Sequence, residues 1–192
     1  MSRRLYVFLA AADTALAATG RDKQRRLTKP LLMPTLLLGK KPRTQRALAL
    51  GGLGDVALLG RSDLAFTAGL GSFLLSHLAW VSALRGREGG GFLQSRPATV
   101  VPYLAAYGGL NGYLWTRTGK DRIPVLVYST ALLAMSLVAL DSGKPRTTLG
   151  GALFLASDSL LALEKFAGVT LPGHEALVMA TYTSAQALLA AE

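Results

Sequence analysis

Two aspartates lie inside long apolar stretches of the chain, and their carboxyl groups are the side chains best suited to acid–base chemistry. Asp55 lies in ALALGGLGDVALLG, and Asp158 lies in LGGALFLASDSLLAL. A carboxylate placed in hydrocarbon costs roughly 2.5–3.5 kcal/mol or more, so such a group normally faces a protein interior or a wet cavity. We therefore predict that these two aspartates are a catalytic pair, in which one stays protonated as a general acid while the other stays ionised.

Further polar side chains in apolar surroundings are predicted to bind substrate or to support the pair. His77 follows Phe73 by four residues, which places both on one face of a helix, and Gln186 follows Tyr182 at the same spacing. An uncharged amide such as Gln186 can bond between helices or orient a water. Lys29 can bind a phosphate or a buried carboxylate. The predicted supporting set is Lys29, His77, Tyr128, Ser157, Tyr182 and Gln186.

Structural interpretations of the same residues remain open at this level. Each aspartate could form an ion pair or a hydrogen bond within a helix bundle, with Lys29 or His77 as the partner. Lys29 precedes a helix-starting proline and could simply extend its amine to the membrane surface. Asp13 is a weaker site candidate, because its helix is expected to start near the membrane interface.

Composition restricts the classes of protein to which the chain can belong. It has 192 residues, of which 51% are hydrophobic and 17% charged, and it contains two histidines and no cysteine. Disulfides and thiolate chemistry are therefore excluded, and we expect no metal and no cofactor. The net charge of +10 gathers in short basic runs between stretches almost free of charge, as in membrane proteins. A nucleic-acid partner is not expected, because the intervening stretches are too continuously apolar.

Eight apolar segments follow one another along the chain. About 20 residues are needed to cross a bilayer, and half of these segments fall short, which is the argument for a soluble all-α protein instead. Against that alternative, nearly all segments lack a polar face, and tilting, local bilayer thinning or flanking cations can compensate for a short span. The segments are approximately Leu5–Thr19, Leu27–Gly39, Ala47–Gly60, Leu64–Leu84, Ala98–Trp115, Ile123–Leu140, Thr148–Leu163 and His174–Ala191.

We therefore predict an all-α, polytopic integral membrane helix bundle with about eight transmembrane helices, forming one domain over residues 1–192. The first twenty residues resemble a signal peptide, but Asp13 interrupts them and seven similar segments follow, so we interpret them as the first span. A slight excess of Lys and Arg in one set of loops places both termini in the cytoplasm, with a bacterial plasma membrane as the expected location.

An ordered set of motifs resembles the YhhN family of membrane proteins, which includes the TMEM86 lysoplasmalogenases of animals. The matching pieces, over nearly the whole chain, are TKPL with Met33-Pro34, LGD ending at Asp55, FTAGLGSFLLSH, GALFLASDSLLALEKF, and Tyr182 with Ala185-Gln186. The resemblance implies eight spans and hydrolysis of the vinyl ether bond of lysoplasmalogens, a lysophospholipid substrate, to a fatty aldehyde and a glycerophosphocholine or glycerophosphoethanolamine. It also implies that the acidic residues of the family match Asp55 and Asp158.

Vinyl ether hydrolysis begins with protonation of the β carbon, and water then captures an oxocarbenium ion, as in glycoside hydrolysis by paired carboxylates. In this hypothesis one aspartate is the acid and the other stabilises the cation and activates water. The alternatives are a small transporter or lipid-binding membrane protein, which predicts carboxylates spread along a path, and a purely structural membrane protein, which predicts paired carboxylates without a cavity. The oligomeric state does not follow from the sequence.

Overall fold

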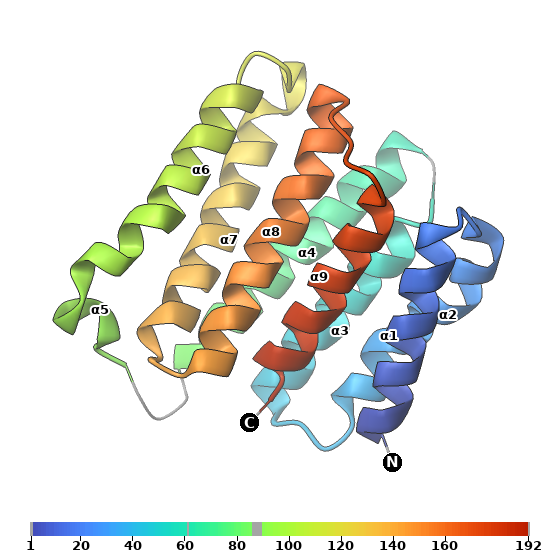
Figure 1. Cartoon of the computed structure of the whole chain (residues 1–192), viewed down its shortest axis with the longest axis horizontal. Helices are drawn as coiled ribbons and strands as arrows, with labels where there is room; N and C mark the ends of the chain where they lie inside the picture. The colour runs from blue at the N-terminus through green and yellow to red at the C-terminus, as the bar shows by residue number, and fades with distance from the viewer. Residues whose placement is uncertain (1, 61, 86–89, 192) are drawn as a thin grey trace.

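The computed structural model describes residues 2–60, 62–85 and 90–191, and these ranges contain helices and connecting turns but no strand. Figure 1 shows long helices that run alternately up and down, with both chain termini at the same end of the bundle. The all-α prediction is confirmed for the described residues.

Eight long helices account for most of the described chain, and each coincides with one of the eight apolar segments. A one-turn helix, α5 (Phe92–Ser95), and two short 3-10 segments, Pro97–Val100 and Gly119–Asp121, lie between them. The long helices are α1 (Ser2–Ala18), α2 (Asp22–Leu37), α3 (Pro42–Ala57), α4 (Asp63–Arg85), α6 (Val101–Leu114), α7 (Arg122–Asp141), α8 (Pro145–Ala167) and α9 (His174–Leu189).

Seven of the long helices form a closed circuit of neighbours. α1 packs on α2, α2 on α3, α3 on α4, α4 on α7, α7 on α8, α8 on α9, and α9 again on α1. α6 stands outside this circuit and packs mainly against α7, with a smaller contact to α8 (Figure 1). Polar side chains that point into the circuit can consequently contact several helices. Because α6 lies outside the circuit, it can form one wall of a cavity beside α7 and α8.

Glycines permit the closest approaches between helices of the circuit. A Cβ added at Gly54 of α3 would lie 2.6 Å from the ring of Phe73 on α4, and one at Gly151 of α8 would lie 2.8 Å from Cβ of Ala139 on α7. Small residues commonly allow this approach in membrane helix bundles. The glycines of α6 behave differently, because a Cβ at Gly109 would meet no atom within 4 Å.

The number of membrane crossings is not confirmed by helix length. Among the described residues, two segments are long and apolar enough to cross a membrane, Asp63–Arg85 and Gly119–Asp141. Five of the eight long helices have 17 residues or fewer, below the usual span of about 20. In these two segments 28% and 39% of the most apolar stretch of 18 residues is buried, whereas a core helix of a soluble protein is mostly buried.

Candidate active site

Asp158 is held by two aromatic residues from neighbouring helices. The phenol of Tyr128 on α7 donates a hydrogen bond of 2.5 Å to its Oδ2, and Nε2 of His77 on α4 lies 3.4 Å from the same oxygen. The His77 ring is fully buried and packs edge-on against Tyr128 at a centroid distance of 5.1 Å. We call Asp158, Tyr128 and His77 the Asp158 cluster. All three residues were predicted from the sequence, and they come from three helices, α8, α7 and α4.

Asp55 is held by a different set of predicted residues, from α2 and α9. The hydroxyl of Tyr182 donates a hydrogen bond of 2.6 Å to its Oδ2, and Nζ of Lys29 lies 3.6 Å from its Oδ1. The amide of Gln186, one helical turn beyond Tyr182, donates to the Tyr182 hydroxyl at 3.3 Å. These four residues form the Asp55 cluster. The ion pair between Asp55 and Lys29 is one of the structural interpretations that remained open from the sequence.

Phe154 separates the two clusters. Its ring packs edge-on against His77 at 4.9 Å and against Tyr182 at 5.6 Å, so it contacts one member of each cluster. The side chain of Phe154 is fully buried. The two aspartates therefore have separate surroundings, and the expectation that both carboxyl groups act on one bond has no direct contact between them to support it.

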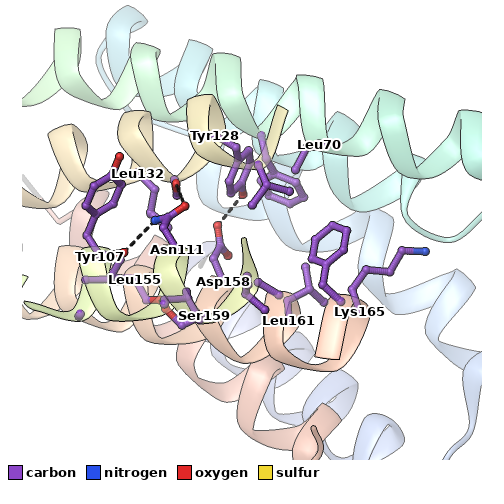
Figure 2. Close-up of a pocket in the computed structure, with 18 of the residues that line it drawn as sticks. Leu70, Tyr107, Asn111, Tyr128, Leu132, Leu155, Asp158, Ser159, Leu161 and Lys165 are labelled. Atoms are coloured by element: carbon purple, nitrogen blue, oxygen red, sulfur yellow. Dashed lines mark hydrogen bonds between the residues drawn. The ribbon is translucent and has the colours of Figure 1, made fainter. Parts of the chain in front are cut away.

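An apolar cavity lies next to Asp158, between α4, α6, α7 and α8. Its volume is about 70 Å³, and Figure 2 shows Asp158, Tyr128 and Asn111 among the side chains around it. The remaining walls are mainly Leu and Phe side chains, including Phe73, Leu110 and Leu155. The carboxyl of Asp158 is 12% exposed, so it forms a polar point on an otherwise apolar wall. Such a combination suits a hydrocarbon chain with a reactive bond.

A charged cavity adjoins the apolar one. It has a volume of about 260 Å³ and shares Leu58 and Leu161 with the lining of the apolar cavity. Three cations from α2 and three acids from α2, α8 and α9 line it. These are Arg25, Arg26 and Lys29, with Asp22, Glu164 and Glu175. The two cavities together offer an apolar compartment beside a compartment of mixed charge.

Ser157 is not part of either cluster, although the sequence placed it in the supporting set. Its hydroxyl donates a hydrogen bond of 3.1 Å to the backbone carbonyl of Val178, which ties α8 to α9. The side chain is buried, and it lines neither cavity. Its neighbour in sequence, Asp158, points instead towards α7, because successive residues of a helix project about 100° apart.

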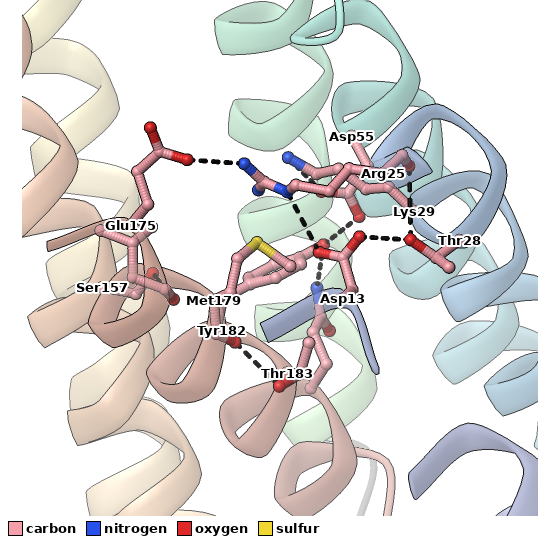
Figure 3. Close-up of polar contacts among 12 residues, drawn as sticks. Asp13, Arg25, Thr28, Lys29, Asp55, Ser157, Glu175, Met179, Tyr182 and Thr183 are labelled. Carbon is pink, nitrogen blue, oxygen red and sulfur yellow. Dashed lines mark hydrogen bonds and ion pairs between the residues drawn. The ribbon is translucent and has the colours of Figure 1, made fainter. Parts of the chain in front are cut away.

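The sequence undervalued a second buried ionic group, which Figure 3 shows beside Lys29. Asp13 is fully buried; it accepts a hydrogen bond of 2.6 Å from Thr28, and its Oδ2 lies 3.6 Å from Nε of Arg25. Arg25 also bonds Glu175 on α9 at 2.8 Å. The signal was present, since Asp13 also interrupts an apolar run. Asp13 is the weaker candidate in the sequence because its helix is expected to start near the membrane interface, whereas the structure buries it against α2.

The described residues contain no group of three or more His, Asp or Glu side chains placed to hold a metal ion.

Comparison with known proteins decides the family. The sequence pattern of the YhhN family matches residues 24–192, which includes both aspartate clusters and leaves Asp13 outside. The chain belongs to the YhhN family. Two lysoplasmalogenases, from Mycobacterium bovis and Mycobacterium tuberculosis, are each 38% identical to this YhhN protein over 136 residues. The alignment covers 66% of this chain and 50% of each relative, so the chain spans about half the length of these curated relatives. No solved structure gives a significant match.

Membership of the YhhN family and the two long apolar helices together indicate a membrane protein. The resemblance noted from the ordered motifs is thus confirmed at the level of the family.

Proposed function

We propose that this YhhN protein is a membrane-embedded hydrolase that cleaves the vinyl ether bond of lysoplasmalogens. The observation that carries the proposal is the position of the Asp158 carboxyl on the wall of an apolar cavity that adjoins a charged one. A lysoplasmalogen has one alkenyl chain and one zwitterionic headgroup, joined through glycerol. The apolar cavity, with its volume of about 70 Å³, suits the part of the chain next to the vinyl ether, and the headgroup matches the mixed charges of the second cavity. The naming of two relatives as lysoplasmalogenases supports the same substrate.

The chemistry requires few groups. A carboxylic acid protonates the β carbon of the vinyl ether, which creates an oxocarbenium ion stabilised by nearby negative charge, and water captures it. The resulting hemiacetal separates into a fatty aldehyde and the glycerophospho-ethanolamine or glycerophosphocholine. In the proposed arrangement both Asp55 and Asp158 are needed for turnover, and water reaches the bond from the charged cavity.

Headgroup binding is assigned to the charged cavity. A phosphate forms strong charge-assisted hydrogen bonds with arginine and lysine. Arg26 is exposed and Lys29 is 12% exposed, and both line this cavity. Glu164 and Glu175 in the same cavity supply negative charge for the ammonium end of the headgroup.

The eight-span arrangement is part of the proposal. Exposed apolar side chains such as Leu64, Leu78 and Val127 point outward from α4 and α7, as lipid-facing residues do. Shorter helices can be accommodated by local thinning of the bilayer and by cations that reach the interface. With eight crossings both termini lie on one side, here the cytoplasmic side of a bacterial plasma membrane.

The alternative function is that of a small transporter, and the arrangement of the cavities does not favour it. Transport requires a path that is accessible in turn from each side. A further cavity lies beside Leu84 and Asp141, at the end of the bundle that carries the termini. The residues described around it include none that lines the charged or the apolar cavity. This supports a site entered from one end or from the lipid rather than a path through the bundle.

The test is aldehyde release from a lysoplasmalogen by the purified protein in detergent. An ester-linked and a saturated ether-linked lysophospholipid with the same headgroup serve as substrate controls. We expect aldehyde only from the vinyl ether. Release of fatty acid from the ester analogue, or no product at all from the folded protein, would refute the proposed reaction.

A further inference from the structure

Asp158 borders the apolar cavity, whereas Asp55 contacts Lys29, and this difference suggests different roles for the two aspartates. We infer that Asp158 alone is the proton donor and acceptor of the reaction, and that Asp55 is a positioning residue that holds Lys29 for the lipid phosphate. This inference rests on the proposed hydrolysis and replaces its paired-carboxylate step with one in which a single carboxyl touches the reacting atoms.

Access is the first reason. Asp158 lines the apolar cavity with a side chain that is 12% exposed, whereas Asp55 lines neither the apolar nor the charged cavity and is 2% exposed. A general acid must come within hydrogen-bond reach of the atom to which it gives its proton. Of these two carboxyl groups, only that of Asp158 borders a space that an alkenyl chain can enter.

Charge is the second reason. Asp55 faces the ammonium of Lys29 at 3.6 Å, so the partner that contacts it most closely by charge is a cation. The contacts to Asp158 are a phenol and an imidazole, which can accept or donate a proton without imposing a permanent charge. Asp55 is consequently tied to a cation that contacts it directly, whereas Asp158 lies beside two groups that can pass protons.

Lys29 connects Asp55 to the substrate. Its ammonium pairs with Asp55, and the same residue lines the charged cavity. Tyr182 holds Asp55 from the other side through its 2.6 Å hydrogen bond. The carboxylate thus fixes the position of an amine that would otherwise be a flexible point charge, and the amine binds the phosphate.

The proposed steps balance with one carboxyl group. Protonated Asp158 gives its proton to the β carbon as the carbon–carbon π bond breaks, which leaves a carboxylate and an oxocarbenium ion. Water forms a bond to the cationic carbon and returns a proton to Asp158. The acid then protonates the ether oxygen of the hemiacetal, the carbon–oxygen bond breaks, and the hydroxyl proton returns to Asp158. One water is consumed, and aldehyde and alcohol are released.

The experiment separates binding from chemistry in the full-length protein. We would measure kcat and KM for aldehyde release, and the Kd of the saturated ether lysophospholipid, which has the headgroup but no double bond to protonate. The variants are Asp158→Asn, Asp55→Asn, Asp55→Glu and Lys29→Met. Asp63→Asn, an exposed aspartate at the start of α4, is the matched control.

For Asp158→Asn we expect kcat to fall by roughly 10²–10⁴-fold, the usual contribution of general acid–base catalysis, with the Kd of the analogue unchanged. For Asp55→Asn and Lys29→Met we expect KM and the analogue's Kd to rise roughly tenfold or more, the worth of one charge-assisted hydrogen bond, with kcat largely kept. Asp55→Glu retains the charge and should restore much of the affinity. A merely structural role for Asp55 would not produce this split.

Several outcomes overturn the inference. A collapse of kcat in Asp55→Asn or Lys29→Met with unchanged affinity for the analogue refutes the division of roles and restores the paired-carboxylate mechanism. Retained kcat in Asp158→Asn refutes it as well. Failure of the folded parent to release aldehyde refutes both this inference and the proposed function. Thermal unfolding in detergent identifies any variant that has lost its fold, and if Asp55→Asn does so, Lys29→Met and Asp55→Glu decide the question.

Discussion

The phenol oxygen of Tyr128 lies 2.5 Å from Oδ2 of Asp158, and this short bond is repeated by Tyr182 and Asp55 at 2.6 Å. Each of the two aspartates predicted to be catalytic therefore has its own tyrosine donor from another helix. The likeness ends there, since one pair borders the apolar cavity and the other is completed by Lys29. Two similar sequence settings thus have different surroundings in the folded protein.

Replacing each tyrosine by phenylalanine should affect different kinetic constants. Tyr128→Phe removes the donor that orients the Asp158 carboxyl, and a hydrogen bond to a charged group is worth about 1.5–3 kcal/mol, so kcat should fall roughly 10–100-fold. Tyr182→Phe should act mainly on KM, because it loosens Asp55 and Lys29. Steady-state kinetics of aldehyde release measures both, and equal losses of kcat in the two variants would contradict this expectation.

Filling the apolar cavity should hinder substrates with a long chain. Leu110 of α6 lines this cavity, and Leu110→Trp would occupy part of its volume of about 70 Å³. We expect a higher KM for long-chain lysoplasmalogens than for short-chain ones, since a short chain needs less of the space. The matched control is Leu104→Trp on the same helix, where the side chain is 49% exposed and does not line the cavity. An equal change in both variants would indicate that the chain binds elsewhere.

Adding a methyl group at Gly54 should destabilise the bundle. The new Cβ would lie 2.6 Å from the ring of Phe73, and overpacking of this kind costs about 1–3 kcal/mol. Gly109→Ala is the control, because a Cβ there meets no atom within 4 Å and alanine is the better helix former. Thermal unfolding in detergent should show a lower midpoint for Gly54→Ala and an unchanged or higher one for Gly109→Ala. A stable Gly54→Ala variant would mean that α3 and α4 are less tightly packed.

The chain contains no cysteine, so single cysteines can report its topology without background. Thr116 and Lys144 are exposed and lie in connections at opposite ends of the bundle, after α6 and before α8. With eight crossings and cytoplasmic termini, Thr116→Cys should react with a membrane-impermeant thiol reagent added to intact cells, and Lys144→Cys only after the cells are broken. Labelling of both in intact cells would exclude the proposed crossing of α7.

Much of the secondary structure could be predicted from the sequence. The eight apolar segments coincide with the eight long helices, because hydrophobic runs and their polar interruptions are local properties. Membrane crossing could not be predicted with the same certainty. Helices of 14–17 residues fall below the usual span, and the ways in which a bilayer adapts to them depend on lipids that the sequence does not encode.

The sequence alone determined which carboxyl groups would be unusual, since Asp55, Asp158 and Asp13 each interrupt an apolar run. Only the tertiary structure decided what surrounds them. Tyr128 is 30 positions from Asp158, and Tyr182 is 127 positions from Asp55, so neither bond follows from spacing along one helix. Whether a carboxyl meets a cavity, a phenol or an ammonium depends on how helices distant in sequence rotate and pack against one another, which local patterns do not specify.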